Sequence, residues 1–294
     1  MSHLVCLGLG FSARVLAGRL ARKGWQVSGT ARTPEGAAEI TARGWRGEVF
    51  DGVNPADALR GDTAGSFRDA THVVVSIPPG EGGDPVLRLH AQDIARFPNL
   101  KWIGYLSTVG VYGDHDGAWV DETTEPRPTS KRSKQRLEAE QAWQDFARGQ
   151  NFKLQIFRLA GIYGPGRSAI DQIEAGKARR IIKKDQVFNR VHVEDIATVL
   201  EAGITGAGSH TLYNVADDEP GPPQDVVAYA ATLLGVEPPP EVAFDEAELT
   251  PMARSFYSER KRASNERLKA DMGVTLAYPS YREGLAAIVA ARRR

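Results

Sequence analysis

The sequence predicts an α/β protein with a doubly wound parallel sheet, and two observations carry this prediction. Short apolar runs alternate with helical patterns through the first half of the 294-residue chain, which is typical of repeated strand–helix units. The first run, residues 3–7, ends on a glycine-rich turn that leads at once into an amphipathic segment. We therefore expect a doubly wound parallel sheet with helices on both of its faces.

The expected strands are short apolar runs, each closed by a turn or by the start of a helix. Six of them cover residues 3–7, 25–29, 49–50, 72–77, 100–108 and 152–159. The fourth is too uniformly apolar for an edge strand, and the Pro-Pro-Gly of residues 78–80 ends it. Asp84 and Pro85 then open a helix, because aspartate caps a first turn and proline fits within it.

The turn after the first strand has the spacing of a dinucleotide-binding fingerprint. It reads G-x-G-x-x-A, with Gly8, Gly10 and Ala13 at the small positions. Gly8 permits the tight turn, Gly10 leaves room for a pyrophosphate, and Ala13 lets the helix lie close to the strand. The free N–H groups at the start of that helix, around Phe11 and Ser12, then face the phosphates. This order of strand, turn and helix predicts a Rossmann-type cofactor site.

The end of the second strand decides between the two nicotinamide cofactors. An acidic residue there binds the ribose 2′-hydroxyl of NAD, whereas arginine accommodates the 2′-phosphate of NADP. Residues 30–33 read Thr-Ala-Arg-Thr, so Arg32 favours NADP over NAD; the alternative is a solvated arginine after a strand. Asp51 either reaches the adenine or only starts the turn at Gly52. Further cofactor contacts are expected at strand ends, from Ser76, Ile77, Pro78, Ser107 and Ala160.

Composition divides the chain into two parts. Proline and glycine become dense after Gly164 and again between Asp217 and Pro240, where the regular alternation fails. We expect a dinucleotide-binding domain over residues 1–165, which also receives strands near residues 186–216. Residues 166–185 and 217–294 are expected to form a smaller substrate-binding lobe.

The charge balance and the cysteine content exclude several classes of protein. The chain has 37 basic and 37 acidic residues and a formal net charge of zero, so nothing overall draws it to nucleic acid or to an anionic membrane. The single cysteine, Cys6, excludes an intrachain disulfide and fits a reducing compartment. No apolar run approaches the length of a membrane span, and no signal peptide precedes the first strand. We expect a cytoplasmic protein, and a homodimer is one option that the sequence leaves open.

Four later segments resemble motifs of the extended short-chain dehydrogenases/reductases. Residues 106–113, LSTVGVYG, are similar to the family's S-S/T-x-x-V-Y-G, and residues 158–167, RLAGIYGPGR, to its R-x-x-x-V-Y-G-P-G. Residues 191–197, VHVEDIA, resemble V-H-V-D-D-x-A, and residues 213–215, YNV, resemble Y-N-V/I. The chain therefore resembles the NAD-dependent epimerase/dehydratase group. The resemblance implies a parallel sheet of about seven strands and a small C-terminal substrate lobe. The short G-x-G-x-x-A turn is similar to that of its atypical branch, many of whose members lack standard catalysis.

The resemblance implies a catalytic Tyr-x-x-x-Lys pair, which this chain lacks. Aligning residues 137–140 with the family's L-A-A-E places Arg132 at the tyrosine and Arg136 at the lysine; a shift by two would place Ser130 and Lys134 there. Arginine cannot replace the tyrosine, because it stays protonated. Arg136 could still bind the ribose, and the alternative for both arginines is a solvated basic face.

Other candidate groups for proton transfer come from the same segments. Thr108 falls at the family's catalytic Ser/Thr position, and Tyr112 or Tyr163 could transfer a proton unless each is a packing tyrosine. A literal Tyr-x-x-x-Lys at Tyr257 to Lys261 lies far downstream, and we interpret it as coincidental. His192 is expected to be structural, with Asp195 capping a helix that begins at Ile196. Scattered histidines give no support for a metal site.

The prediction for the substrate rests on a stretch of basic residues. It comprises Lys177, Arg179, Arg180, Lys183 and Lys184. In the family this region holds the phosphates of nucleotide sugars. The resemblance thus implies a phosphorylated or nucleotide-linked substrate, with contacts from Lys183, Arg167, Arg190 and Tyr163. The alternative is a set of exposed helix charges.

Two functions remain open on these grounds. One is an NADP-dependent oxidoreductase or epimerase of the atypical type, which uses Thr108 and Arg136 with a different proton donor. The other is an NADP(H)-binding redox sensor or regulatory protein without turnover. The fold does not choose between them, because function depends on the site. We expect an enzyme, because the strand-end segments and the substrate lobe are retained.

Overall fold

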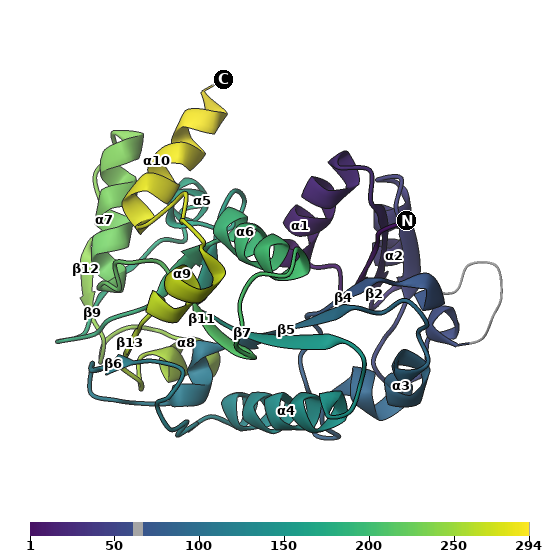
Figure 1. The fold of residues 1–294 in the computed structure, drawn as a ribbon. Helices are drawn as coiled ribbons and strands as arrows, with labels where there is room; N and C mark the ends of the chain where they lie inside the picture. Colours follow the sequence, from purple (N-terminus) through teal and green to yellow (C-terminus); the bar gives the residue numbers. More distant parts are fainter. Residues whose placement is uncertain (61–66, 294) are drawn as a thin grey trace.

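The computed structural model describes residues 1–60 and 67–293. Its centre is a sheet of seven parallel strands in the order β11-β7-β5-β4-β1-β2-β3 (Figure 1). The strands are β1 His3–Leu7, β2 Gln26–Ala31, β3 Arg46–Val49, β4 His72–Val75, β5 Trp102–Thr108, β7 Lys153–Leu159 and β11 Leu212–Val215. The predicted doubly wound α/β fold is confirmed. The strand expected at residues 49–50 is the end of β3, which begins at Arg46.

Alternate residues of each strand point to opposite faces of the sheet, which creates two cores. Leu4 and Cys6 of β1 belong to the first core, and Val5 and Leu7 belong to the second. Helices α1 Phe11–Arg22, α2 Pro34–Thr41, α6 Val193–Ile204 and α9 Glu266–Met272 contribute to the first core; α3 Pro85–Ala95 and α4 Lys131–Ala147 contribute to the second. In Figure 1, α1 and α6 lie above the sheet and α4 lies below it.

The order of the strands reverses at β1. The chain runs from β1 outward to β2 and β3, and then crosses to β4 on the other side of β1. In sheets of this kind a ligand binds outside the carboxyl ends of the strands, at the point of reversal. The turn after β1 and the segment after β4 therefore face a common site.

A second group of elements lies beside the sheet, on the left of Figure 1. Helices α5 Ala169–Glu174, α7 Pro223–Leu234 and α10 Tyr281–Arg292 share a small core with Ile170, Val226 and Leu285. Short parallel pairs extend this group: β8 Gly161–Tyr163 with β10 Arg190–His192, β9 Arg180–Ile182 with β12 Glu241–Ala243, and β6 Trp119–Val120 with β13 Arg262–Ala263. Helix α8 is Pro251–Phe256, and 3₁₀ helices cover Asp57–Leu59, Phe67–Asp69 and Val109–Tyr112.

Two features of the C-terminal third differ from the expectation. Helix α9 packs through Leu268 and Met272 into the first core, so it belongs with the sheet rather than with the second lobe. Helix α6 begins at Val193 and is capped by His192, whose Nδ1 accepts from the N–H of Glu194 at 3.2 Å. The prediction that Asp195 caps this helix is wrong. Its carboxylate accepts from the N–H groups of Ala277 and Tyr278, and so ties the segment before α10 to α6.

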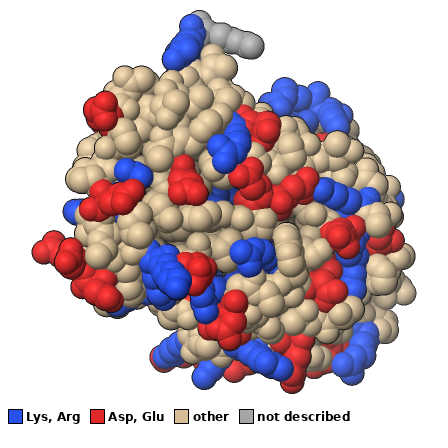
Figure 2. Space-filling model, turned by 90° about the vertical axis from the view of Figure 1, so that its left-hand side faces the viewer, with Lys and Arg blue, Asp and Glu red and all other residues tan. Residues whose placement is uncertain are grey.

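The surface mixes both signs of charge. On the face shown in Figure 2, lysine and arginine side chains are interspersed with aspartate and glutamate. Within residues 1–60 and 67–293, no helix is both long enough and apolar enough to cross a membrane.

A buried ion pair joins α4 to the sheet. Nη2 of Arg158 on β7 lies 2.7 Å from Oε2 of Glu140 on α4, and the two side chains are 5% and 1% exposed. Oγ of Ser107 on β5 donates to Glu140 Oε1 at 2.5 Å. The Arg158 guanidinium also lies 4.7 Å from the centre of the Tyr112 ring. One carboxylate thus links a helix to two neighbouring strands.

Removing this carboxylate should destabilise the protein strongly. Glu140→Ala leaves the Arg158 charge buried without its partner, which costs about 3–5 kcal/mol of unfolding free energy. Chemical denaturation followed by circular dichroism measures the loss. The matched control is Glu138→Ala on the exposed face of the same helix, with an expected change below about 0.5 kcal/mol. Equal losses in the two variants would contradict this role for Glu140.

Candidate functional site

A cleft of about 1080 Å³ opens at the carboxyl ends of the strands. Its walls come from the turn after β1, the ends of β4, β5 and β7, the first turns of α4, and the second lobe. Because these are the positions where doubly wound sheets bind ligands, the cleft is the candidate site. Of the residues predicted for a cofactor, those that line it are Gly10, Phe11, Ser12, Ala13, Ser76, Pro78, Ser107 and Ala160.

The glycine turn is shaped to admit a ligand. Gly8 has a φ of +88°, and a Cβ there would meet Ser76 Oγ at 2.8 Å. Gly10 has no atom within 4 Å of the position a Cβ would occupy. Gly10 precedes α1, and α1 has neither a side-chain cap nor an acidic residue in its first turn. The first N–H groups of α1 are therefore available to a diphosphate, which the positive end of the helix dipole also favours.

The segment after β4 supports this turn. The Ser76 hydroxyl donates to the carbonyl of Gly8, and Ser76 and Pro78 line the cleft. Ile77 instead packs against the second core. Ile77 was predicted as a cofactor contact, but it is not among the residues that line the cleft.

Arg32 and Asp51, which were both predicted to contact the adenosine part of the cofactor, have different surroundings. Arg32 follows β2 directly and is exposed; β2 also holds the glycine turn, since Thr30 Oγ1 accepts from the N–H of Gly8 at 2.9 Å. Asp51 uses its carboxylate in a local turn, accepting from the N–H groups of Val53 and Asn54. These hydrogen bonds lower the pKa of Asp51. Of its two interpretations, the structure favours the turn.

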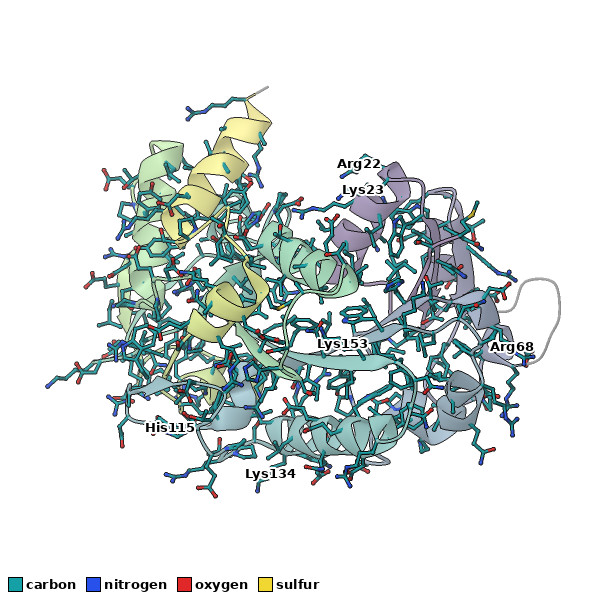
Figure 3. All side chains as sticks on the ribbon, viewed as in Figure 1. Arg22, Lys23, Arg68, His115, Lys134 and Lys153 are labelled. Atoms are coloured by element: carbon teal, nitrogen blue, oxygen red, sulfur yellow. The ribbon has the colours of Figure 1, made fainter. Side chains whose placement is uncertain are left out.

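The two arginines of α4 have different surroundings. Arg136 lines the cleft, and its Nη1 donates to Tyr105 Oη at 3.0 Å and to the Leu106 carbonyl at 2.9 Å. Arg132 is exposed, and its Nη1 lies 3.4 Å from Met252 Sδ on α8. Lys134, from the alternative alignment, is also exposed, on the outer side of α4 in Figure 3. Only Arg136 has the polar contacts that would hold it in one position within the cleft.

The tyrosines near the cleft have their hydroxyls engaged elsewhere. Tyr112 is fully buried, and its hydroxyl donates to Asn214 Oδ1 at 2.8 Å. The Tyr163 ring lines the cleft, but its hydroxyl donates to the Ser280 carbonyl at 3.2 Å. Burial raises the pKa of both hydroxyls. Neither contact leaves its hydroxyl proton directed at the cleft.

Thr108 has a hydroxyl in the cleft at the end of β5. Its Oγ1 accepts from the N–H of Gly110 at 3.1 Å. A Cβ on Gly110 would lie 3.3 Å from that oxygen and 3.1 Å from Ser133 Oγ. The Thr108 proton can therefore be donated to a substrate oxygen beside the first turn of α4.

The sequence analysis missed an ion pair in the cleft. Lys261 Nζ lies 2.7 Å from Glu259 Oε2 and donates to the Gly113 carbonyl at 2.7 Å. Glu259 Oε1 accepts from the Thr129 hydroxyl at 2.5 Å. Tyr257 packs among Phe188 and Phe244, away from Lys261, so these two do not form a Tyr-x-x-x-Lys site. No local pattern could have shown the pair, because the contact with Gly113 spans 148 residues.

Cationic side chains dominate the cleft. Among the described residues that line it, one is a carboxylate, Glu259, and seven are cationic: Arg132, Arg136, Arg167, Lys177, Arg179, Arg190 and Lys261. The Arg167 guanidinium lies 5.7 Å from the centre of the Phe11 ring on α1. Lys183 does not line the cleft, because it binds the Tyr257 carbonyl and lies against the Phe244 ring. The arrangement suits an anionic ligand, but its contacts do not come from Lys183.

Asp217 lies behind the cleft, at the end of β11. Its N–H donates to the Arg190 carbonyl at 2.7 Å. Asp217 is 2% exposed, and among the described residues no side chain donates a hydrogen bond to its carboxylate. Burial raises the pKa of Asp217 to about 8, although the Arg190 guanidinium opposes the rise. Burial also lowers the pKa of Arg190. The carboxyl group is therefore neutral at pH values where a free aspartate is charged.

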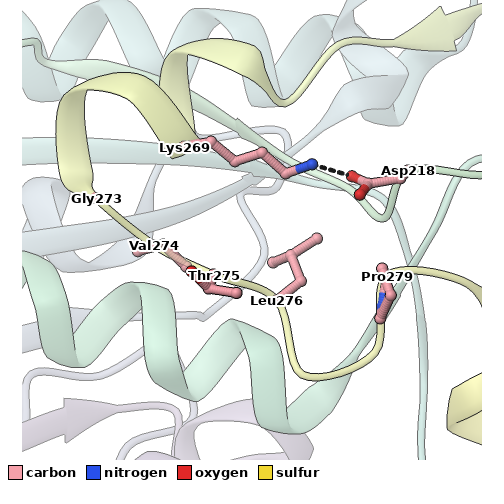
Figure 4. Close-up of a pocket in the computed structure, with 7 residues that line it drawn as sticks. All are labelled: Asp218, Lys269, Gly273, Val274, Thr275, Leu276 and Pro279. Carbon is pink, nitrogen blue, oxygen red and sulfur yellow. Dashed lines mark hydrogen bonds and ion pairs between the residues drawn. The ribbon is translucent and has the colours of Figure 1, made fainter.

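A smaller pocket of about 450 Å³ lies beside α9 (Figure 4). An ion pair between Lys269 and Asp218, 2.5 Å apart, crosses one side of it. The segment from Gly273 to Leu276 forms another side. This pocket shares no lining residue with the cleft, so we place the site in the cleft.

Known proteins are similar to this chain over most of its length. The sequence profile of the NAD dependent epimerase/dehydratase family matches residues 89–216. Protein YeeZ of Escherichia coli K12 is 30% identical over 246 residues, which cover 81% of this chain and 86% of YeeZ. A conserved protein of unknown function from Silicibacter pomeroyi has a solved structure that is 49% identical, with a TM-score of 0.88 and full coverage of both chains.

A more distant neighbour shares the fold. The UDP-glucuronic acid 4-epimerase of Bacillus cereus, solved in complex with NAD, is 18% identical, covers all of both chains and has a TM-score of 0.71. The sequence motifs, the sheet order and these matches agree, and the chain belongs to the NAD-dependent epimerase/dehydratase family of extended short-chain dehydrogenases/reductases.

Proposed function

We propose that this protein is an NADP(H)-dependent oxidoreductase that acts on an anionic small molecule. The observation that carries the proposal is the open space at Gly10, beside the uncapped start of α1, in the wall of the cleft. A side chain is missing where a diphosphate would lie, and unpaired N–H groups face that position. The B. cereus epimerase of the same fold binds NAD, which supports a dinucleotide here.

Each part of the cofactor has a group in this chain that could hold it. The N–H groups of α1 would bind the diphosphate, and Arg32 at the end of β2 would pair with the 2′-phosphate of NADP. Arg136 is held at the first turns of α4, where it would bind the nicotinamide ribose. When bound, the cofactor supplies or accepts the hydride.

The charges of the side chains in the cleft support an anionic substrate. Seven cationic side chains and one carboxylate line the cleft in a chain whose net charge is zero. Such an imbalance concentrates anions in a cleft. Arg167 and Arg190 are the proposed anion contacts, and the Thr108 hydroxyl would donate to the substrate oxygen that reacts. The substrate would carry a phosphate or a carboxylate.

One observation favours a second candidate, a regulatory protein that binds NADP(H) without turnover. The hydroxyls of Tyr105, Tyr112 and Tyr163 are all hydrogen-bonded within the protein. Both alignments with the family motif, which place either Arg132 or Ser130 at the catalytic position, lack a tyrosine there. Stopped-flow oxidation of bound NADPH by a panel of phosphorylated and carboxylated carbonyl compounds separates the two candidates. Turnover of any member that falls at least tenfold in Thr108→Val supports the enzyme. Tight NADPH binding without turnover across the panel supports the regulator.

Substituting Gly10 tests the cofactor site directly. Gly10→Val should lower the affinity for NADPH about 100-fold, because the side chain would displace a diphosphate held by charge-assisted hydrogen bonds worth about 1.5–3 kcal/mol each. Because the Cβ would meet empty space, the unfolding free energy should change by no more than about 1 kcal/mol. NADPH fluorescence and chemical denaturation measure the two effects. Gly18→Ala, within α1, is the control and should leave the affinity unchanged. Unaltered NADPH binding by Gly10→Val would refute the site.

Arg32 should set the preference for NADP over NAD. Arg32→Asp should lower the affinity for NADPH about 10- to 100-fold, the loss of one charge-assisted contact to a phosphate, and should leave or raise the affinity for NADH. Calorimetric titration of both cofactors measures the preference. Arg22→Ala, at the far end of α1 (Figure 3), is the control. If the unaltered protein binds both cofactors equally, Arg32 has no such role.

A further inference from the structure

Helix α8 presents large apolar side chains to the cleft instead of burying them. None of its residues is buried, and Met252 and Phe256 are 57% and 59% exposed. The two residues are four positions apart, so they share one face of the helix, and both line the cleft. Exposed apolar surface within a ligand site is surface that a ligand covers.

This apolar face lies at the end of the cleft where the substrate would react, near Thr108 and the first turn of α4. Met252 Sδ is 3.4 Å from Nη1 of Arg132, in the first turn of α4. Helix α8 therefore lies next to the first turn of α4, where both alignments place the family's tyrosine position. Ser133 of that turn and Thr108 lie beside the same glycine, Gly110.

A packed aromatic group extends and supports the apolar face. Phe188 lines the cleft, and its ring centre is 5.1 Å from that of Tyr257, the residue that ends α8. Tyr257 in turn lies 5.2 Å from Phe244. We call Phe188, Met252 and Phe256 the apolar wall. The ring of Phe188 is held by its neighbours, so this part of the wall is formed before any ligand binds.

The hydroxyl groups near the wall are mostly engaged within the protein. Ser130 Oγ donates to Ser133 Oγ and accepts from the N–H of Ser133, which caps α4. Ser107 donates to Glu140, and Ser255 donates to the Met252 carbonyl. A sugar ring needs hydrogen-bond partners for each hydroxyl that it buries. The hydroxyl protons of Ser107, Ser130 and Ser255 are therefore not available to such a ring.

We infer that the reacting part of the substrate is an aryl group with an anionic substituent, and not a sugar. The aryl ring would lie on the apolar wall, and its carboxylate or phosphate would pair with a cation of the cleft such as Arg132 or Lys261. The inference rests on the proposed function, because the nicotinamide position defines which end of the cleft reacts. It narrows the substrate from an anionic molecule to an aromatic acid.

Calorimetric titration with two aromatic acids, trans-cinnamate and 2-naphthoate, tests the wall. The protein is used both saturated with NADP⁺ and without cofactor. Phe256→Ala should weaken the binding of both acids about five- to tenfold, as expected for the loss of one aromatic contact, and Met252→Ala with Phe256→Ala should weaken it further. Both side chains are exposed, so thermal unfolding should show that these variants remain folded. Trp119→Ala removes an aromatic residue that is also 59% exposed but lies outside the cleft, and it should change nothing.

Three results would overturn the inference. The first is that the unaltered protein binds neither acid in either state. The second is that Phe256→Ala leaves the affinity for the acids unchanged. The third is that UDP-glucose binds more tightly than the acids and loses affinity in Phe256→Ala, which would identify a sugar on the wall. A protein that does not bind NADP⁺ would contradict the proposed function. The titrations without cofactor would still test whether the acids bind to the apolar wall.

Discussion

The contact between Glu140 and Arg158 determines how the helix α4 sits on the sheet. Both side chains are almost completely removed from solvent, so each charge depends on the other for its solvation. The Ser107 hydroxyl completes the group and brings β5 into it. The residues at the start of α4 that line the cleft take their positions from this anchor further along the helix. They are Ser130, Arg132, Ser133 and Arg136. The geometry of the candidate site therefore depends on a pair of charges that does not itself touch the cleft.

The site combines a retained cofactor turn with an altered reacting end. The glycine turn has the short form of the atypical branch, whereas the strand-end segments and the order of the sheet follow the family. Neither alignment of the first turn of α4 with the family motif supplies a tyrosine, and the tyrosines nearby are bonded to Asn214, Ser280 and Arg136. What the cleft offers in their place is the Thr108 hydroxyl and the ion pair of Glu259 and Lys261. If the protein is an enzyme, a group other than a tyrosine would transfer the proton. If it is a regulatory protein without turnover, no such group is needed.

The sequence predicted those parts of the structure that depend on residues close to one another in the chain. Strand runs, the glycine turn and the cap at Asp84 each require residues within a few positions of one another, and each is present. The parts that it missed depend on partners distant in the chain. Tyr112 bonds to a residue 102 positions away, and Lys183 bonds to one 74 positions away. The pattern also could not show that α8 leaves its apolar residues uncovered, because exposure is a property of the assembled fold.

The buried carboxyl of Asp217 gives the junction between sheet and lobe an unusual response to acidity. Its pKa is raised to about 8 in the folded chain, against about 3.9 in an unfolded one. Between these values the folded state holds a proton that the unfolded state has released, so this group's contribution is greatest below about pH 4 and declines as the pH rises towards 8. Carboxylates in ion pairs behave in the opposite sense. Mild alkalinity would loosen this boundary, and with it the backbone of Arg190 that borders the cleft.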